Sequence, residues 1–313
     1  MSTSSESEAR IRGEGDLPVE ASQPQAPAVL WRSVVLNPAG EAVARVAYCE
    51  ATAPVAEILG RHHTLGASAQ ALAETLVTAG LLSTLVKGEE QVSIRLAGRG
   101  GLTSVTVDAT AQGGLRGYAR PKHLPGLGVI EALGAGAAHV MRALGSKVIY
   151  QGAVPFEAGG IGETFQRYLA TSEQIPSRLS VQVLVEPEVA ARGAVIQAIG
   201  GAEPEEVEQL LSSLSDEQWS AALAAVPASP LQALLPSGYQ VSEVHGQPLM
   251  SYCTCSRDRV EATLRLLGAE DLIQLRDEQG GAEVDCHWCG KQYLFEAAEL
   301  TNLAVELQPD LLH

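Results

Sequence analysis

Four cysteines near the end of this 313-residue chain form two close pairs that could hold a metal ion. The first pair is Cys253 and Cys255, the second is Cys286 and Cys289, and 30 residues separate the pairs. Four thiolates bind Zn²⁺ as a tetrahedron with Zn–S distances of about 2.3 Å, which brings the sulfurs within about 4 Å of one another. Thiolates in such a site can also be oxidised. The spacing therefore predicts that all four cysteines bind one zinc ion and that the site has redox capacity.

The spacing leaves open whether the zinc site would be an inert structural ribbon or a redox centre. A small module buries little apolar core, and structural zinc contributes roughly 10–16 kcal/mol in small peptides at neutral pH. The first pair has one intervening residue, where ordinary zinc ribbons have two, and this tighter arrangement favours oxidation of the neighbouring sulfurs. His287 lies inside the second pair, but four thiolates already complete the tetrahedron, so we predict no ligand role for it.

The other residues that could do chemistry point to structural roles. Cys49 follows a predicted strand, where a small apolar thiol is expected to fill the core. His62 and His63 lie near Glu57 without a cysteine close by, and we expect them at a solvated helix end. Two Gly-x-Gly pairs lack the third glycine of a dinucleotide-binding fingerprint. No Ser/His/Asp or paired-carboxylate pattern stands out, so no catalytic residue is predicted.

The charge balance of the chain argues against nucleic acid as a partner. There are 37 acidic and 21 basic residues, a net charge of −16, and such a surface repels phosphate backbones. No apolar run reaches the roughly 18 residues that cross a bilayer, and the N-terminal segment does not have the pattern of a secretory signal. We therefore expect a cytoplasmic protein without membrane contact, in which paired cysteines are more often metal ligands or redox groups than structural disulfides.

Changes in composition divide the chain into four segments. Residues 1–28 are rich in Ser, Glu, Pro and Gln, and we predict a disordered tail there. Residues 29–200 are expected to form the main domain, 201–247 a short helical linker, and 248–313 a four-cysteine zinc-binding domain. The expected fold class is α+β, with a largely antiparallel sheet packed under helices in the main domain.

Apolar periodicity predicts the elements of the main domain. A hairpin is expected to turn at residues 37–40, and apolar residues at helical spacing predict a helix over 68–86. Further strands are expected at 91–97, 102–107, 148–154 and 179–185, with a helix at 161–171.

Short helices are expected in the linker. One covers 204–214, and a second begins near Asp216 and carries Trp219 and Leu223. Isolated helices of this length are marginal in water, so the linker is expected to be stable mainly through docking on its neighbours.

In the zinc-binding domain, Ser256 is expected to cap a helix that directly follows the first cysteine pair. Two short strands, at 283–286 and 292–295, are expected to flank the second pair, and a final helix follows them. Gly290 supplies a permissive backbone just after the last of the four sulfurs.

Several motifs along the chain match those of one known family. They are Cys253-Thr-Cys255-Ser-Arg-Asp-Arg-Val, Asp285-Cys286-His-Trp-Cys289-Gly290, Leu85-Val86-Lys87-Gly88-Glu89-Glu90, Arg116-Gly117-Tyr118-Ala119, Tyr150-Gln151-Gly152, and Tyr168 followed by Ser172-Glu173-Gln174. Through these motifs residues 29–313 resemble the heat shock protein 33 family of redox-regulated holdase chaperones. The chain departs from the family in its N-terminal tail and in a Gly/Ala-rich stretch from Pro125 to Ala138.

The resemblance implies a chaperone whose activity depends on its redox state. It implies that the four reduced cysteines bind one zinc ion in the inactive protein. It further implies that oxidation forms the disulfides Cys253–Cys255 and Cys286–Cys289, releases zinc and unfolds the linker, so that exposed apolar surface binds unfolding client proteins under oxidative stress. Such activity is not enzymatic and needs no ATP, and the oxidised protein can form a homodimer.

Two other hypotheses compete with this one. A zinc module that binds nucleic acid is disfavoured, because residues 251–313 contain 5 basic and 12 acidic residues, a net charge of −7. A dithiol–disulfide oxidoreductase needs its C-x-x-C at the start of a helix, whereas Cys286 and Cys289 lie between two predicted strands. Within the redox hypothesis we expect Cys286 and Cys289 to be oxidised first, because His287 and an exposed Trp288 would indicate that the turn between these two cysteines is open to solvent.

Overall fold

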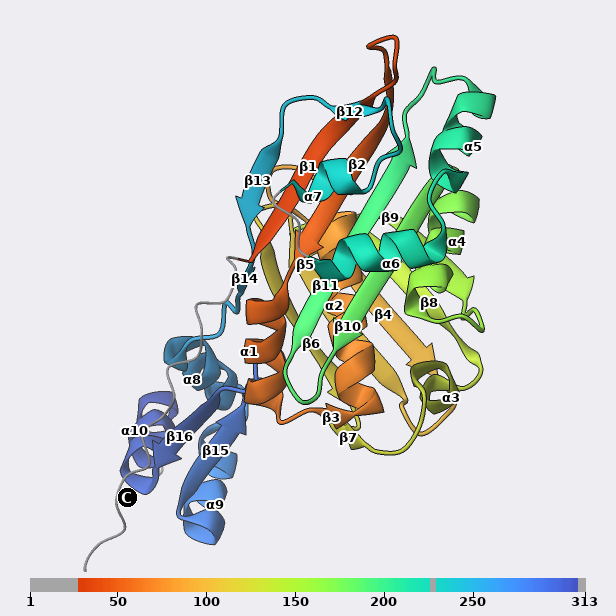
Figure 1. Ribbon diagram of the computed structural model, residues 1–313. Helices are drawn as coiled ribbons and strands as arrows, with labels where there is room; N and C mark the ends of the chain where they lie inside the picture. The colour runs from red at the N-terminus through yellow and green to blue at the C-terminus, as the bar shows by residue number, and fades with distance from the viewer. Residues whose placement is uncertain (1–27, 226–228, 309–313) are drawn as a thin grey trace, which may run out of the picture.

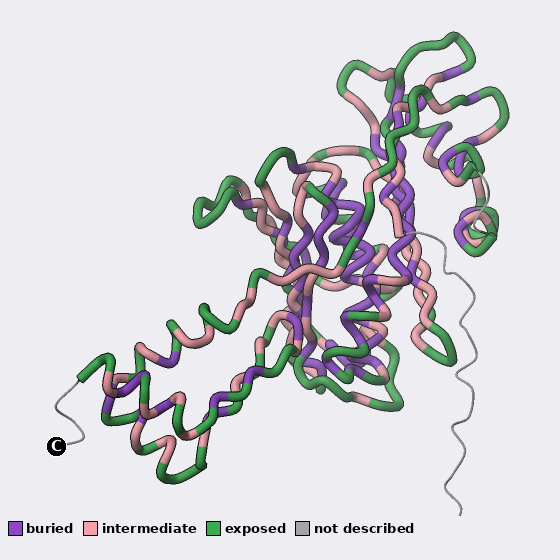
Figure 2. Tube along the Cα trace, turned by 90° about the vertical axis from the view of Figure 1, so that its left-hand side faces the viewer, coloured by how far each residue is buried: buried purple, intermediate pink, exposed green. Residues whose placement is uncertain are grey.

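The computed structural model describes residues 28–225 and 229–308, which form a large main domain and a small C-terminal module (Figure 1). The module (Cys253–Leu307) lies at one end of the main domain, beside helix α1 (Thr52–His62). Buried positions concentrate in the main domain and are fewer in the module (Figure 2). Residues 1–27 of the predicted disordered tail lie outside the described residues.

The first sheet of the main domain is six-stranded and antiparallel, with β2 at its centre. Its strands are β1 (Val29–Leu36), β2 (Ala42–Glu50), β10 (Ser177–Leu184), β11 (Ala190–Ala198), β12 (Gln240–Val241) and β13 (His245–Pro248). The order is β10-β11-β2-β1-β12, and β13 also pairs with β1. β1 and β2 form the predicted hairpin, and Gly40 takes a φ of 84° in its turn. The linker segment therefore contributes two short strands, β12 and β13, that the apolar pattern did not predict.

The second sheet is also six-stranded and reaches the start of the module. Its strands are β4 (Glu90–Gly98), β5 (Ser104–Thr110), β6 (Gly114–Arg120), β8 (Gly136–Leu144), β9 (Lys147–Pro155) and β14 (Met250–Ser251). The order is β14-β6-β5-β4-β8-β9, and every pairing is antiparallel except that of β14 with β6. Because β14 ends just before the first cysteine pair, this sheet fixes one end of the module. A separate short parallel pair joins β3 (Leu65–Gly66) to β7 (His123–Leu124).

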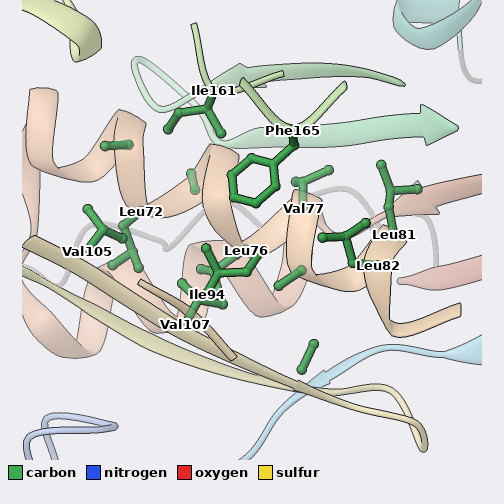
Figure 3. Packing of buried hydrophobic residues seen from close by; sticks show 14 of the residues in the cluster. Leu72, Leu76, Val77, Leu81, Leu82, Ile94, Val105, Val107, Ile161 and Phe165 are labelled. Atoms are coloured by element: carbon green, nitrogen blue, oxygen red, sulfur yellow. The ribbon is translucent and has the colours of Figure 1, made fainter. Parts of the chain in front are cut away.

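Helix α2 (Ala67–Leu82) forms the centre of the main domain and packs against both sheets. Fourteen of its 16 residues are buried, as expected for a helix that has apolar residues all round. Leu76 lies against Ile94 and Val107 of the second sheet, and Phe165 covers the helix from the other side (Figure 3). The predicted helix at 68–86 corresponds to α2 and a following 3₁₀ turn (Ser83–Leu85).

The linker helices cover the outer face of the first sheet, opposite α2 (Figure 1). They are α5 (Pro204–Ser212), α6 (Asp216–Ala225) and α7 (Pro230–Ala233), and the other main-domain helices are α3 (Val129–Leu133) and α4 (Ile161–Thr171). Trp219 and Leu223 of α6 are buried there with Tyr48 and Ile196 of the sheet. This apolar cluster is separate from the core around α2.

The C-terminal module is a small unit of one hairpin and three helices within the described residues. Its elements are α8 (Arg257–Arg265), α9 (Ala269–Gln279), β15 (Gly281–Asp285), β16 (Gln292–Glu296) and α10 (Ala297–Leu307). Nine buried residues form its apolar cluster, with Leu272, Phe295 and Leu300 among the largest. A cluster this small supplies little stability without a further constraint such as a metal. The mixed architecture of the two parts confirms the predicted α+β class.

Candidate metal centre

Two loops bring the four predicted cysteines together. Cys253 and Cys255 lie between β14 and α8, where the Ser256 hydroxyl caps the helix by accepting a hydrogen bond from the Arg259 amide at 3.2 Å. Cys286 and Cys289 lie in the turn between β15 and β16, which we call the knuckle (residues 286–290). The helix cap and the two short strands were predicted from the sequence, and they fix both cysteine pairs on regular elements.

The backbone of the knuckle is closed by hydrogen bonds. The Gly290 amide donates to the Cys286 carbonyl at 2.7 Å, and the Cys286 amide donates to the Lys291 carbonyl at 2.9 Å. Gly290 has a φ of 69°, and a Cβ atom there would lie 2.6 Å from the carbonyl oxygen of Arg61 in α1. Glycine is therefore required for the turn itself and for the close approach of the knuckle to the main domain.

The four cysteine sulfurs form a compact cluster. They all lie within 4.8 Å of one another, with Cys253 and Cys286 3.7 Å apart and Cys255 and Cys289 3.4 Å apart. A regular tetrahedron with metal–sulfur bonds of about 2.3 Å has edges of about 3.8 Å. The donor set therefore fits a four-coordinate metal ion that prefers thiolates. Within the described residues the cluster consists of these cysteines alone, and His287 is not part of it.

The thiols of Cys253, Cys255 and Cys289 lie in environments that shift their pKa values in different directions. Burial raises the pKa of the Cys253 and Cys289 thiols. Burial also works against ionisation of Cys255, but hydrogen bonds from Tyr293 and from the other thiols outweigh it and lower the pKa of Cys255 to about 7. The Tyr293 hydroxyl donates to the Cys255 sulfur at 3.2 Å. Tyr293 thus supports a thiolate in this cluster, a role for which the sequence held no signal beyond its place on a predicted strand.

Two residues near the metal centre differ from their predicted environments. His62 was expected at a solvated helix end, but it is 2% exposed, and the Trp288 carbonyl accepts a hydrogen bond from its Nε2 atom at 3.1 Å. Trp288 was expected to be exposed, but it is half-buried against the main domain. Both predictions were wrong because the knuckle docks on α1 and β6, a tertiary contact that local sequence does not encode. Of the two residues behind the argument for early oxidation of Cys286 and Cys289, only His287 is exposed, and the order of oxidation stays a prediction.

Cys49 occupies the core, as predicted. It is 0% exposed in β2, and burial raises the pKa of its thiol far above the ordinary value. Because the thiolate is the reactive form, we expect iodoacetamide to modify the four clustered cysteines of the metal-free protein, in which the module is unfolded and the main domain is folded, and to leave Cys49 unmodified until the main domain is unfolded as well. Mass spectrometry of tryptic peptides measures this, and equal labelling of Cys49 in the folded protein would contradict the prediction.

The fold and the site together define a class of protein: a main domain of two sheets that carries a separate four-cysteine module. The family model described as Hsp33 protein matches residues 37–296. A 33 kDa chaperonin from Geobacter sp. (strain M21) is 34% identical over 275 residues, which cover 84% of this chain and 93% of that protein. A 33 kDa chaperonin from Levilactobacillus brevis is 35% identical over 273 residues, or 83% and 92% of the two chains.

A solved structure agrees with the sequence comparisons. The crystal structure of the 33 kDa chaperonin (heat shock protein 33 homolog) from Thermotoga maritima matches with a TM-score of 0.81 and 26% identity, covering 91% of this chain and all of that one. The chain therefore belongs to the Hsp33 family of chaperones. In the described part of the chain, no helix combines the length and the apolar character needed to span a membrane.

Proposed function

We propose that this chain is an ATP-independent holdase chaperone that is switched on by oxidation of Cys253, Cys255, Cys286 and Cys289. The observation that carries the proposal is the cluster of four thiol sulfurs within 4.8 Å of one another, placed directly after a linker of short helices. Membership of the Hsp33 family supports the chaperone class. In this proposal residues 29–200 bind clients, 201–247 form the linker, and 248–313 form the redox switch of a cytoplasmic protein.

In the reduced state the four cysteines hold one Zn²⁺ ion and keep the module folded. Zinc has no redox chemistry of its own and supplies folding free energy, roughly 10–16 kcal/mol in small peptides. The first cysteine pair directly follows β14, which pairs with β6, and the linker before it ends in β13, which pairs with β1. The folded module therefore fixes the C-terminal end of the linker to both sheets.

Oxidation converts the cysteine ligands to disulfides. Hydrogen peroxide oxidises one thiolate to a sulfenic acid and releases hydroxide; a second thiolate then attacks that sulfur and displaces a second hydroxide. Two electrons pass from the sulfur pair to the peroxide, whose oxygens become water after taking up two protons. We assign the pairs Cys253–Cys255 and Cys286–Cys289 from the family resemblance. Disulfide sulfurs carry no negative charge, so the cysteines no longer bind the metal and the module loses its main source of stability.

Loss of the module releases the linker. The helices α5, α6 and α7 have only 9, 10 and 4 residues, and helices of this length are not stable alone. Their undocking would expose Trp219 and Leu223 together with Tyr48 and Ile196 of the first sheet. A contiguous apolar surface of this kind binds unfolding proteins. The net charge of −16 would help to keep the complexes soluble, and the released surface also allows a homodimer to form.

Light scattering from a heat-denatured client protein tests the proposal. Reduced, zinc-loaded protein is expected to leave aggregation unchanged, and the same sample after peroxide treatment is expected to suppress it without ATP. An insulin-reduction assay on both samples serves as the control for a dithiol oxidoreductase. If the peroxide-treated protein has lost its zinc and the client still aggregates as it does in buffer, the proposed function is wrong.

A further inference from the structure

Arg116 of β6 contacts two aromatic residues beside the metal centre from the main domain. Its guanidinium carbon lies 4.1 Å from the ring centre of Trp288 and 5.3 Å from that of Tyr252. Trp288 lies between the two cysteines of the second pair, and Tyr252 directly precedes Cys253 of the first pair. One cationic side chain of the second sheet therefore touches the aromatic neighbour of each cysteine pair, and such contacts are favourable by cation–π attraction.

The position of Arg116 is fixed by a buried carboxylate. Asp108 on the adjacent strand β5 is 2% exposed, and its Oδ2 atom accepts hydrogen bonds from the Nε and Nη2 atoms of Arg116 at 2.9 and 2.6 Å. The other oxygen, Oδ1, accepts a hydrogen bond from the Ser93 hydroxyl of β4 at 2.6 Å. Three neighbouring strands thus hold the guanidinium in one orientation, which is the orientation in which it meets Trp288.

The knuckle is enclosed by two further residues of the main domain. Tyr118, two positions after Arg116 on the same face of β6, meets the Trp288 ring edge-on with centroids 5.4 Å apart, a favourable aromatic geometry. From α1, the buried His62 bonds the Trp288 carbonyl. These contacts depend on the backbone conformation of the knuckle. Cys286 and Cys289, on either side of Trp288, determine that conformation.

We propose that Arg116 is a positioning residue of the redox switch. Its contact with Trp288, which we call the clamp, couples the oxidation and metal-binding state of the four cysteines directly to docking of the module on the second sheet. This coupling is additional to the linker, which contacts the first sheet. By linkage, the clamp favours metal binding by the same factor by which metal binding favours the clamp. A weaker clamp should therefore speed metal loss and lower the amount of oxidant that activates the protein; the second consequence rests on the proposed function.

The test compares Arg116→Lys with a matched control, Arg95→Lys. Lysine keeps a cation beside Asp108, so the buried carboxylate is not left unpaired, but it lacks the planar group that stacks on Trp288. Arg95 is an exposed residue of β4 that lies on the same face of the second sheet as Arg116. At a fixed peroxide concentration, Arg116→Lys is expected to release zinc to a chromogenic chelator about 5- to 30-fold faster than wild type. Arg95→Lys should match wild type.

A Trp288→Leu variant completes a double-mutant cycle. If the clamp acts through Trp288, adding Arg116→Lys to Trp288→Leu should cause no further increase in the rate of zinc release. Fully additive effects of the two substitutions, or an Arg116→Lys rate equal to that of Arg95→Lys, would overturn the proposal.

A second readout follows docking without oxidant or client. The chain has three tryptophans, so incorporation of 5-fluorotryptophan gives three ¹⁹F resonances, and single Trp→Phe variants assign them. In zinc-loaded Arg116→Lys the Trp288 resonance should move toward its position in zinc-free wild type. If Arg116→Lys speeds zinc release through Trp288 but the oxidised protein does not suppress client aggregation, the proposed function alone is contradicted. Suppression by an oxidised protein in which Arg116→Lys behaves like Arg95→Lys would contradict the clamp alone.

Discussion

A Cys286→Ser variant is expected to lose its metal ion and the fold of the module. A neutral hydroxyl replaces one of four thiolates, and bound zinc is worth roughly 10–16 kcal/mol to a small domain. The nine buried residues of the module cannot replace that contribution. Metal analysis should find almost no zinc, and hydrogen exchange across α8, α9 and α10 should become fast while α2 stays protected. Under the proposed function, this variant also binds clients without oxidant.

Cys49→Ala is the matched control for this experiment. It also removes one thiol, but from the core of the main domain, where the sulfur lies outside the cluster. This variant should keep one zinc ion per chain and a protected module, with only a modest loss of main-domain stability. A Cys286→Ser protein that retained zinc and a protected module would contradict a four-cysteine site.

A Trp219→Ala variant is expected to suppress client aggregation in the reduced state while its zinc stays bound. Trp219 is 2% exposed beneath α6, and the Arg178 guanidinium lies 4.9 Å from its ring centre. Truncating a buried tryptophan typically costs about 3–5 kcal/mol. That loss falls on a linker whose helices are marginal, so the linker should undock without any change at the cysteines. Light scattering and zinc analysis of the same reduced sample measure both effects.

Glu217→Ala controls for the Trp219 substitution. Glu217 lies two residues before Trp219 in α6 and is exposed, so its removal should change stability by only a few tenths of a kcal/mol and leave the reduced protein inactive. Hydrogen exchange of α2 checks that the main domain stays folded in both variants. If reduced Trp219→Ala has a mobile linker yet leaves client aggregation unchanged, the linker does not mask the client-binding surface.

The elements with strong local signals were predictable from the sequence. Helix α4 was predicted at its observed bounds, 161–171, and α2 within a few residues, because a long run of apolar residues at helical spacing has few other solutions. The hairpin that carries Cys286 and Cys289 was predicted from two short alternating stretches. The close approach of the four sulfurs followed from spacing alone, since two tight pairs on one small module can meet without long-range information.

Elements that depend on tertiary pairing were not predictable. β8 (Gly136–Leu144) is rich in Gly and Ala and has one β-branched residue, yet it pairs along its length with β4 and β9. Its neighbours, not its own propensity, make it a strand. β13 is a strand because β1 offers it an edge. In the same way, the burial of His62 and Trp288 arises only when the knuckle docks on α1 and β6.

The most direct test is a peroxide titration of the reduced, zinc-loaded protein, in which zinc release and suppression of client aggregation are measured on the same sample at each point. Both quantities should rise together and reach their plateaus at the same oxidant dose, and both should return to baseline after reduction in the presence of zinc. A sample that has released its zinc, contains both disulfides and still lets the client aggregate as in buffer would contradict the account.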